Sequence, residues 1–71
     1  MEIRNMSNTE LLKYEDSLDY RDFDVIEEIL RRAEKIEDGI TERYEESFQP
    51  GKENTDELFE YITQILIDDE K

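Results

Sequence analysis

The sequence predicts an all-α domain with three main helices, at about residues 8–18, 23–48 and 55–67. Two observations predict this class: apolar residues recur at helical spacing in three places, and polar or Pro-Gly segments separate those places. With 71 residues, 1–71 form one small domain, and a chain of this length buries only about 60% of its unfolded surface. Since the chain has no cysteine to reinforce so thin a core, we expect it to gain support as a homodimer.

The first helix is predicted by the sequence S-N-T-E at residues 7–10, which has the pattern of a capping box. In such a box the Ser7 hydroxyl accepts from the Glu10 amide, and the Glu10 carboxylate accepts from the Ser7 amide. Leu11, Tyr14 and Leu18 then fall on one side of a helix at spacings of three and four. We expect this helix to end near Leu18.

The second helix is predicted to begin with Asp24 and Glu27, which repeat the box pattern, although Asp22 is an alternative cap. Its apolar residues alternate at spacings of three and four, like the a and d positions of a heptad. We call them the apolar seam and expect them to form the core or the dimer interface: Ile26, Ile29, Ala33, Ile36 and Ile40.

Gly39 interrupts this second segment and can end a helix in a left-handed cap. Tyr44 and Phe48, however, continue the apolar spacing beyond Ile40, and an interior glycine costs only about 1 kcal/mol relative to alanine. We therefore favour one continuous helix to about Phe48, with a break at Gly39 as the alternative.

The third helix follows the sequence Q-P-G-K at residues 49–52, where proline disfavours helix before it and glycine permits a turn. Asn54 with Glu57 is the predicted cap, and Thr55 is the alternative. Four residues form its apolar stripe: Leu58, Ile62, Ile65 and Leu66. The polar residues 68–71 are expected to fray.

The charge of the chain restricts its partners. Twenty-two acidic residues against nine basic ones give a net charge of −13, which repels nucleic acid and anionic membranes. We therefore expect no direct nucleic-acid binding, no membrane contact and a basic protein partner. The longest apolar run covers only residues 65–67, far below the ~18 residues of a membrane span, and the sequence has no basic segment followed by an apolar run of the kind expected of a secretory leader. We expect a soluble, cytoplasmic protein.

The chain contains neither histidine nor cysteine. This removes the usual general base, the nucleophilic thiol and most transition-metal ligands. The acidic residues near position 22 do not have the spacing of a calcium-binding loop, and helix capping explains them more simply. We expect no enzymatic activity, no cofactor and no bound metal.

Residues 34–46, EKIEDGITERYEE, pose an electrostatic question. In one continuous helix, Glu34, Asp38, Glu42 and Glu46 would follow one another at i, i+4, where each like-charge pair costs roughly 0.2–0.5 kcal/mol. The preceding turns instead place Glu27 and Glu28 four residues before Arg31 and Arg32, the favourable orientation. A function for these carboxylates would explain why the unfavourable arrangement is present.

Phosphate mimicry is one such function. At a helical rise of about 1.5 Å per residue, residues 34–46 would present about one carboxylate per 3 Å, close to the ~3.4 Å phosphate spacing of one DNA strand. The expected partner-binding residues are Glu34, Glu37, Asp38, Glu42, Glu45 and Glu46. Further acidic residues near the predicted helix starts extend the negative field: Asp19, Asp22, Asp24, Glu53, Asp56 and Glu57.

In length, charge and this acidic segment, the chain resembles the small acidic bacteriophage proteins that mimic DNA to shut down host machinery. It is similar to the phage inhibitors of the bacterial histone-like protein HU, which cover the DNA-binding surface of HU as dimers. The resemblance implies an inhibitor that acts in the host bacterial cytoplasm. The alternatives are an acidic inhibitor of another host or defence machine, such as RNA polymerase or a CRISPR nuclease, and a non-inhibitory helical assembly module.

Overall fold

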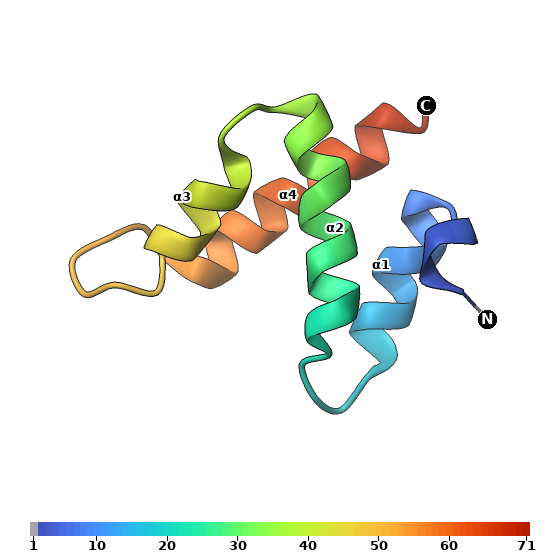
Figure 1. Cartoon of the computed structure of the whole chain (residues 1–71), viewed down its shortest axis with the longest axis horizontal. Helices are drawn as coiled ribbons and strands as arrows, with labels where there is room; N and C mark the ends of the chain where they lie inside the picture. The colour runs from blue at the N-terminus through green and yellow to red at the C-terminus, as the bar shows by residue number, and fades with distance from the viewer. Residues whose placement is uncertain (1) are drawn as a thin grey trace.

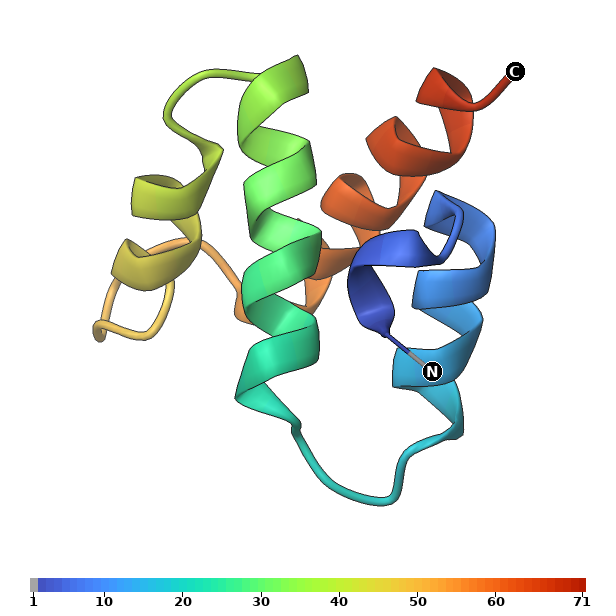
Figure 2. The ribbon, with the colours of Figure 1, turned by 45° about the vertical axis from the view of Figure 1, so that its right-hand side comes forward.

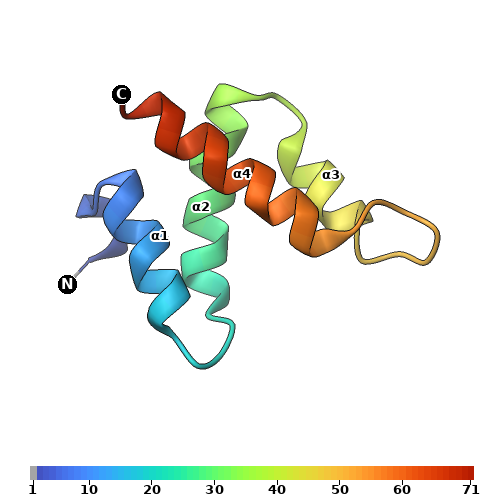
Figure 3. The same ribbon diagram turned by 180° about the vertical axis from the view of Figure 1, so that it is seen from behind.

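The computed structural model describes residues 2–71, and the all-α prediction is confirmed there: this range contains helices and no strand. A short 3-10 helix, η1 (Ile3–Asn5), precedes four α-helices: α1 (Asn8–Ser17), α2 (Phe23–Ile36), α3 (Ile40–Glu46) and α4 (Thr55–Asp69). α2 lies in the middle of the molecule, between α1 and α3 (Figure 1), and it packs against both. Seen from behind, α4 crosses α2 and also contacts α1 and α3 (Figure 3).

Local capping explains where three of the helices begin. The capping box of α1 is present as predicted, with 3.1 Å hydrogen bonds from the Glu10 amide to the Ser7 hydroxyl and from the Ser7 amide to Glu10 Oε1. The alternative cap Asp22 starts α2 by accepting from the Asp24 amide at 3.0 Å. Asn54 starts α4 and accepts from two amides of its first turn. Each cap satisfies amides that lack a partner within the helix.

The prediction of one continuous helix across residues 23–48 is wrong. α2 ends at Ile36, Gly39 lies in the left-handed region with φ 91°, and a separate helix, α3, begins at Ile40. Glycine adopts this conformation without the steric penalty of a Cβ atom. The chain therefore turns between α2 and α3, and α3 packs beside α2 instead of extending it.

The core lies where α1, α2 and α4 meet. Leu11, Ile29, Leu58, Ile62 and Leu66 are completely buried there. Most of the apolar seam is also buried inside the chain, by the chain's own helices, and only Ile36 is substantially exposed, at 41%. The seam thus serves as monomer core, and its apolar character alone does not call for a second copy.

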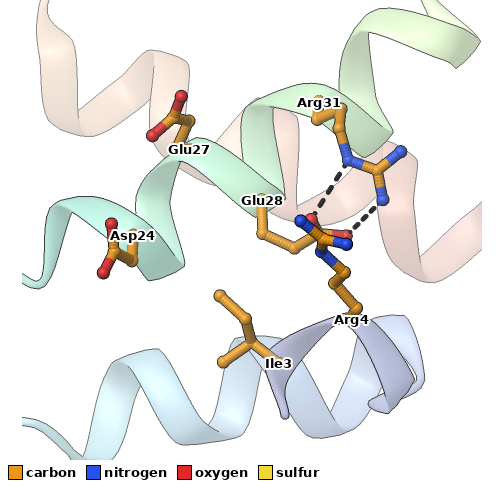
Figure 4. Close-up of a pocket in the computed structure, with 6 residues that line it drawn as sticks. All are labelled: Ile3, Arg4, Asp24, Glu27, Glu28 and Arg31. Carbon is orange, nitrogen blue, oxygen red and sulfur yellow. Dashed lines mark hydrogen bonds and ion pairs between the residues drawn. The ribbon is translucent and has the colours of Figure 1, made fainter.

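The N-terminal turn η1 lies against α2 (Figure 2), and a buried carboxylate of α2 helps to hold it there. Glu28, only 7% exposed, accepts hydrogen bonds from Arg31 at 2.6 and 3.1 Å, as Figure 4 shows, and from Arg32 Nε at 2.8 Å. The Arg31 and Arg32 guanidinium groups hold the pKa of this carboxyl below its ordinary value. Arg32 also donates to the Asn8 side chain and to the carbonyl of Ile3, so one ionic group joins three segments of the chain.

The start of α1 is also bonded to the end of α4. The Asn8 side chain donates to the Leu66 carbonyl at 3.0 Å, and the Thr9 amide and hydroxyl donate to the Glu70 carboxylate at 3.1 and 2.8 Å. These bonds explain why α4 continues to Asp69, two residues past its predicted end. The C-terminal turn that was expected to fray is instead tied to the start of α1.

Candidate functional site

The exposed carboxylates of the α2–α3 turn and of α3 form the candidate binding site. We call Asp38, Glu42, Glu45 and Glu46 the acidic surface; all four are exposed. No ion pair within residues 2–71 involves any of them. Their oxygens are therefore open to hydrogen-bond donors from another molecule.

Glu34, the first of the six predicted partner-binding residues, has an intramolecular role instead. Its carboxylate accepts from the Gly39 amide at 2.7 Å and from the Thr41 amide at 3.0 Å. These amides belong to the start of α3, where Gly39 has no side chain with which to cap the helix. Glu34 thus supplies from α2 the cap that α3 lacks.

The same contacts change the acidity of Glu34. Hydrogen bonds from the backbone of Gly39 and then of Thr41 lower the pKa of Glu34 to about 2. The group therefore stays ionised at neutral pH with both oxygens engaged. Because the turn at Gly39 also separates Glu34 from Glu42, the regular spacing calculated for one straight helix does not apply to residues 34–46.

A second carboxylate, Glu37, belongs to a cluster centred on Arg43 of α3. Arg43 forms a bidentate pair with Glu53, with N–O distances of 2.7 and 2.6 Å, and lies 3.5 Å from a Glu37 oxygen. Its guanidinium group sits 5.4 Å from the centre of the Tyr61 ring, and the Tyr61 hydroxyl donates to Glu37. The cluster joins the α2–α3 turn, α3, the following loop and α4.

The charges in this cluster shift the pKa values of Arg43, Glu53 and Tyr61. The hydrogen bonds from Arg43 lower the pKa of Glu53, and the bond to Glu37 raises the pKa of Tyr61. Arginine is suited to this position because its planar fork matches a carboxylate. Glu37 and Glu53 are consequently positioned by Arg43, whereas the acidic surface has no such cation.

The remaining predicted acidic residues lie near two helix starts. Asp22 caps α2, and Asp56 lies 3.7 Å from Arg21 at the exposed start of α4. Arg21 also donates to the Tyr44 hydroxyl at 3.0 Å, which brings the α1–α2 loop against α3 and α4. Three of the acidic residues are exposed and belong to no ion pair within residues 2–71: Asp19, Asp24 and Glu57.

An apolar groove between α2 and α3 is a feature that sequence analysis missed. This α2–α3 groove has a volume of about 900 Å³, and its apolar lining comes from Phe23, Ile26, Leu30, Tyr44 and Phe48. Phe23 is 79% exposed and Phe48 is 64% exposed. The Phe48 ring meets Tyr44 edge-on with 5.2 Å between ring centres. The groove exists because the turn at Gly39 lays α3 beside α2.

Comparisons with protein-family models, curated proteins and solved structures found no match to this chain. None of the helices within residues 2–71 combines the length and the apolar character needed to cross a membrane. The geometry and charge of the described residues are therefore the basis for a functional proposal.

Proposed function

We propose that this domain is a DNA mimic that binds the basic DNA-binding surface of a host protein and blocks DNA binding, with an HU-like nucleoid protein as the first candidate. The observation that carries this proposal is the set of unpaired, exposed carboxylates on and beside α3 in a chain of net charge −13. Lysine and arginine residues that hold phosphates also donate to carboxylates, and charge-assisted bonds of this kind are strong. The mimic would thus use the donors that DNA uses.

The contacts that hold α3 in place support the same proposal. The helix is short, with bounds Ile40–Glu46, but Glu34 caps its start and Arg43 links it to Glu53 and Tyr61. A binding surface that is already ordered loses less conformational entropy when the partner binds. The acidic surface therefore combines unpaired charge with a fixed backbone.

Competition for DNA tests this function. The unmodified protein, called the parent below, is added to an HU-like protein bound to a DNA duplex. The parent should release the DNA and bind no DNA itself, and the release should weaken as the salt concentration rises. The site variant changes Asp38→Asn, Glu42→Gln and Glu46→Gln together. Exposed ion pairs contribute about 0.2–1 kcal/mol each, so roughly tenfold more of the variant should be needed.

A matched control separates this surface from overall charge. Asp16→Asn, Glu60→Gln and Asp69→Asn remove the same number of exposed carboxylates elsewhere on the molecule. The control should compete almost as well as the parent. If the parent releases no DNA, HU is the wrong partner, and if both triple variants lose activity equally, net charge alone acts and α3 has no special role.

A helical assembly module is a second candidate, favoured by the two exposed phenylalanine rings of the α2–α3 groove. Under this alternative, apolar contact would be the function and the carboxylates would serve solubility. Salt distinguishes the two, because apolar association does not weaken when charges are screened.

A further inference from the structure

We propose that a second copy of this chain occupies the α2–α3 groove, so that the groove is the interface of a homodimer. The proposal does not depend on the DNA-mimic function, because the groove and the binding of a basic partner involve different chemistry. It also differs from a dimer formed through the apolar seam, most of which is already buried within one chain.

The apolar surface of the groove contains the two features that a symmetric pair requires, projecting side chains and a hollow. In a two-fold dimer the same surface patch meets itself, so the patch must contain both the projecting groups and the hollow that receives them. Phe23 and Phe48 project into solvent at 79% and 64% exposure, and both line a hollow of about 900 Å³. Aromatic side chains are enriched at protein interfaces relative to the rest of the surface.

The charges around the groove select a second copy over a basic protein. The groove is lined by as many basic as acidic residues: Arg21, Arg31 and Lys35 against Glu27, Glu34 and Glu45. Since these charges cancel, the rest of the chain carries the whole net charge of −13. Two copies repel each other elsewhere, but at the groove each meets charges of both signs. A basic partner would meet three cations there and is better matched to the acidic surface.

This interface would leave the proposed partner-binding carboxylates accessible. Asp38, Glu42 and Glu46 do not line the groove, and only Glu45 belongs to both surfaces. A dimer would therefore present two sets of these carboxylates while covering its exposed aromatic rings. The same chain could pair through one side of α3 and bind a basic protein through another.

Sedimentation of the full chain over a range of concentrations tests the proposal. The parent should show a monomer–dimer equilibrium that tightens with added salt, because salt screens the repulsion between two acidic chains. Binding of a basic partner should show the opposite salt dependence, so the two proposals fail separately. A parent that remains monomeric at all concentrations would overturn the dimer and leave the groove to a different occupant.

Two pairs of variants locate the interface. The double change Phe23→Ser and Phe48→Ser should raise the dimer dissociation constant by at least about tenfold, since each ring buries apolar surface in the pair. Tyr20→Ser is the control, because Tyr20 is as exposed as Phe48 but does not line the groove. Circular dichroism of each variant establishes that the helices remain.

The second pair keeps overall charge equal. Lys35→Glu changes the groove, whereas Lys13→Glu changes an exposed lysine outside it, and both variants have the same net charge. Lys35→Glu should weaken the dimer several-fold more than Lys13→Glu. Equal dimer affinities for Lys35→Glu and Lys13→Glu, or for the parent and the double serine variant, would show that the groove is not the interface.

Discussion

The Glu34 carboxylate accepts a 2.7 Å hydrogen bond from the Gly39 amide, so that a side chain of α2 caps the helix that follows it. This contact answers the electrostatic question posed by residues 34–46. Glu34 is used at the break between two helices and does not repel Asp38 and Glu42 along one straight helix. Within α3, only Glu42 and Glu46 keep the i, i+4 relationship.

Removing the charge of Glu34 should destabilise the fold. In Glu34→Gln the amide is a weaker acceptor for the Gly39 and Thr41 amides, so we expect a melting temperature lower by a few degrees, roughly the shift that a lost cap causes in a small domain. Glu46→Gln is the control and should melt no lower than the parent, because Glu46 lies in the last turn of α3, where negative charge is unfavourable. Thermal melts followed by circular dichroism measure both.

The pH dependence of the Glu34 effect has a defined sign. The folded state lowers the pKa of Glu34 to about 2, so its stabilising contribution is complete above the unfolded value near 4.5 and is lost as pH falls toward 2. The difference in melting temperature between the parent and Glu34→Gln should therefore shrink over that interval. A difference that stays constant down to pH 2 would contradict the cap.

The Glu28→Gln variant should lower the free energy of unfolding by about 2–3 kcal/mol, because it leaves the Arg32 guanidinium, only 14% exposed, without its charged partner. The folded-state pKa of Glu28 is also lowered, so the loss should be full at neutral pH and diminish as pH falls below the unfolded value near 4.5. Urea unfolding at several pH values measures this. Glu27→Gln changes an exposed neighbour and should stay within about 0.5 kcal/mol of the parent.

Gly39→Ala tests the break between α2 and α3. A Cβ atom at this position would meet nothing within 4 Å. The loss of stability should therefore come from the backbone, whose φ of 91° is unfavourable for alanine. We expect a loss of about 1–2 kcal/mol, and a smaller loss for Gly39→Asn, since asparagine tolerates left-handed backbone better. An alanine variant as stable as the parent would favour a continuous helix at this position.

The helices whose causes are local could be predicted from the sequence. The capping box at Ser7 and the cap at Asn54 are each complete within a few residues, and both helices begin where expected. The break at Gly39 could not be predicted from the sequence, because Ile40 and Tyr44 keep the same apolar spacing whether the helix runs straight or turns. Both residues are buried in the structure, and the spacing predicts an apolar face for either backbone, so periodicity could not distinguish the two.

The candidate site was harder to predict, because its membership depends on contacts between distant elements. Acidic composition identified the region, but Arg43 pairs with Glu53 ten residues away and holds it by two hydrogen bonds. Arg31 likewise binds the buried Glu28 instead of the expected Glu27, since Glu28 is the one that faces the packed side of α2. Which carboxylates remain unpaired is thus a property of the tertiary structure.

The bonds between Thr9 and Glu70 connect residues that are 61 positions apart. During synthesis, α1 leaves the ribosome long before the turn of α4 that receives it, so the complete packing of α1 has to wait until residue 70 has emerged. Contacts between such distant positions slow folding relative to purely local ones. A nascent chain halted before α4 has emerged would lack every contact between α1 and α4, so the part of α1 that packs against α4 would still be accessible to chaperones.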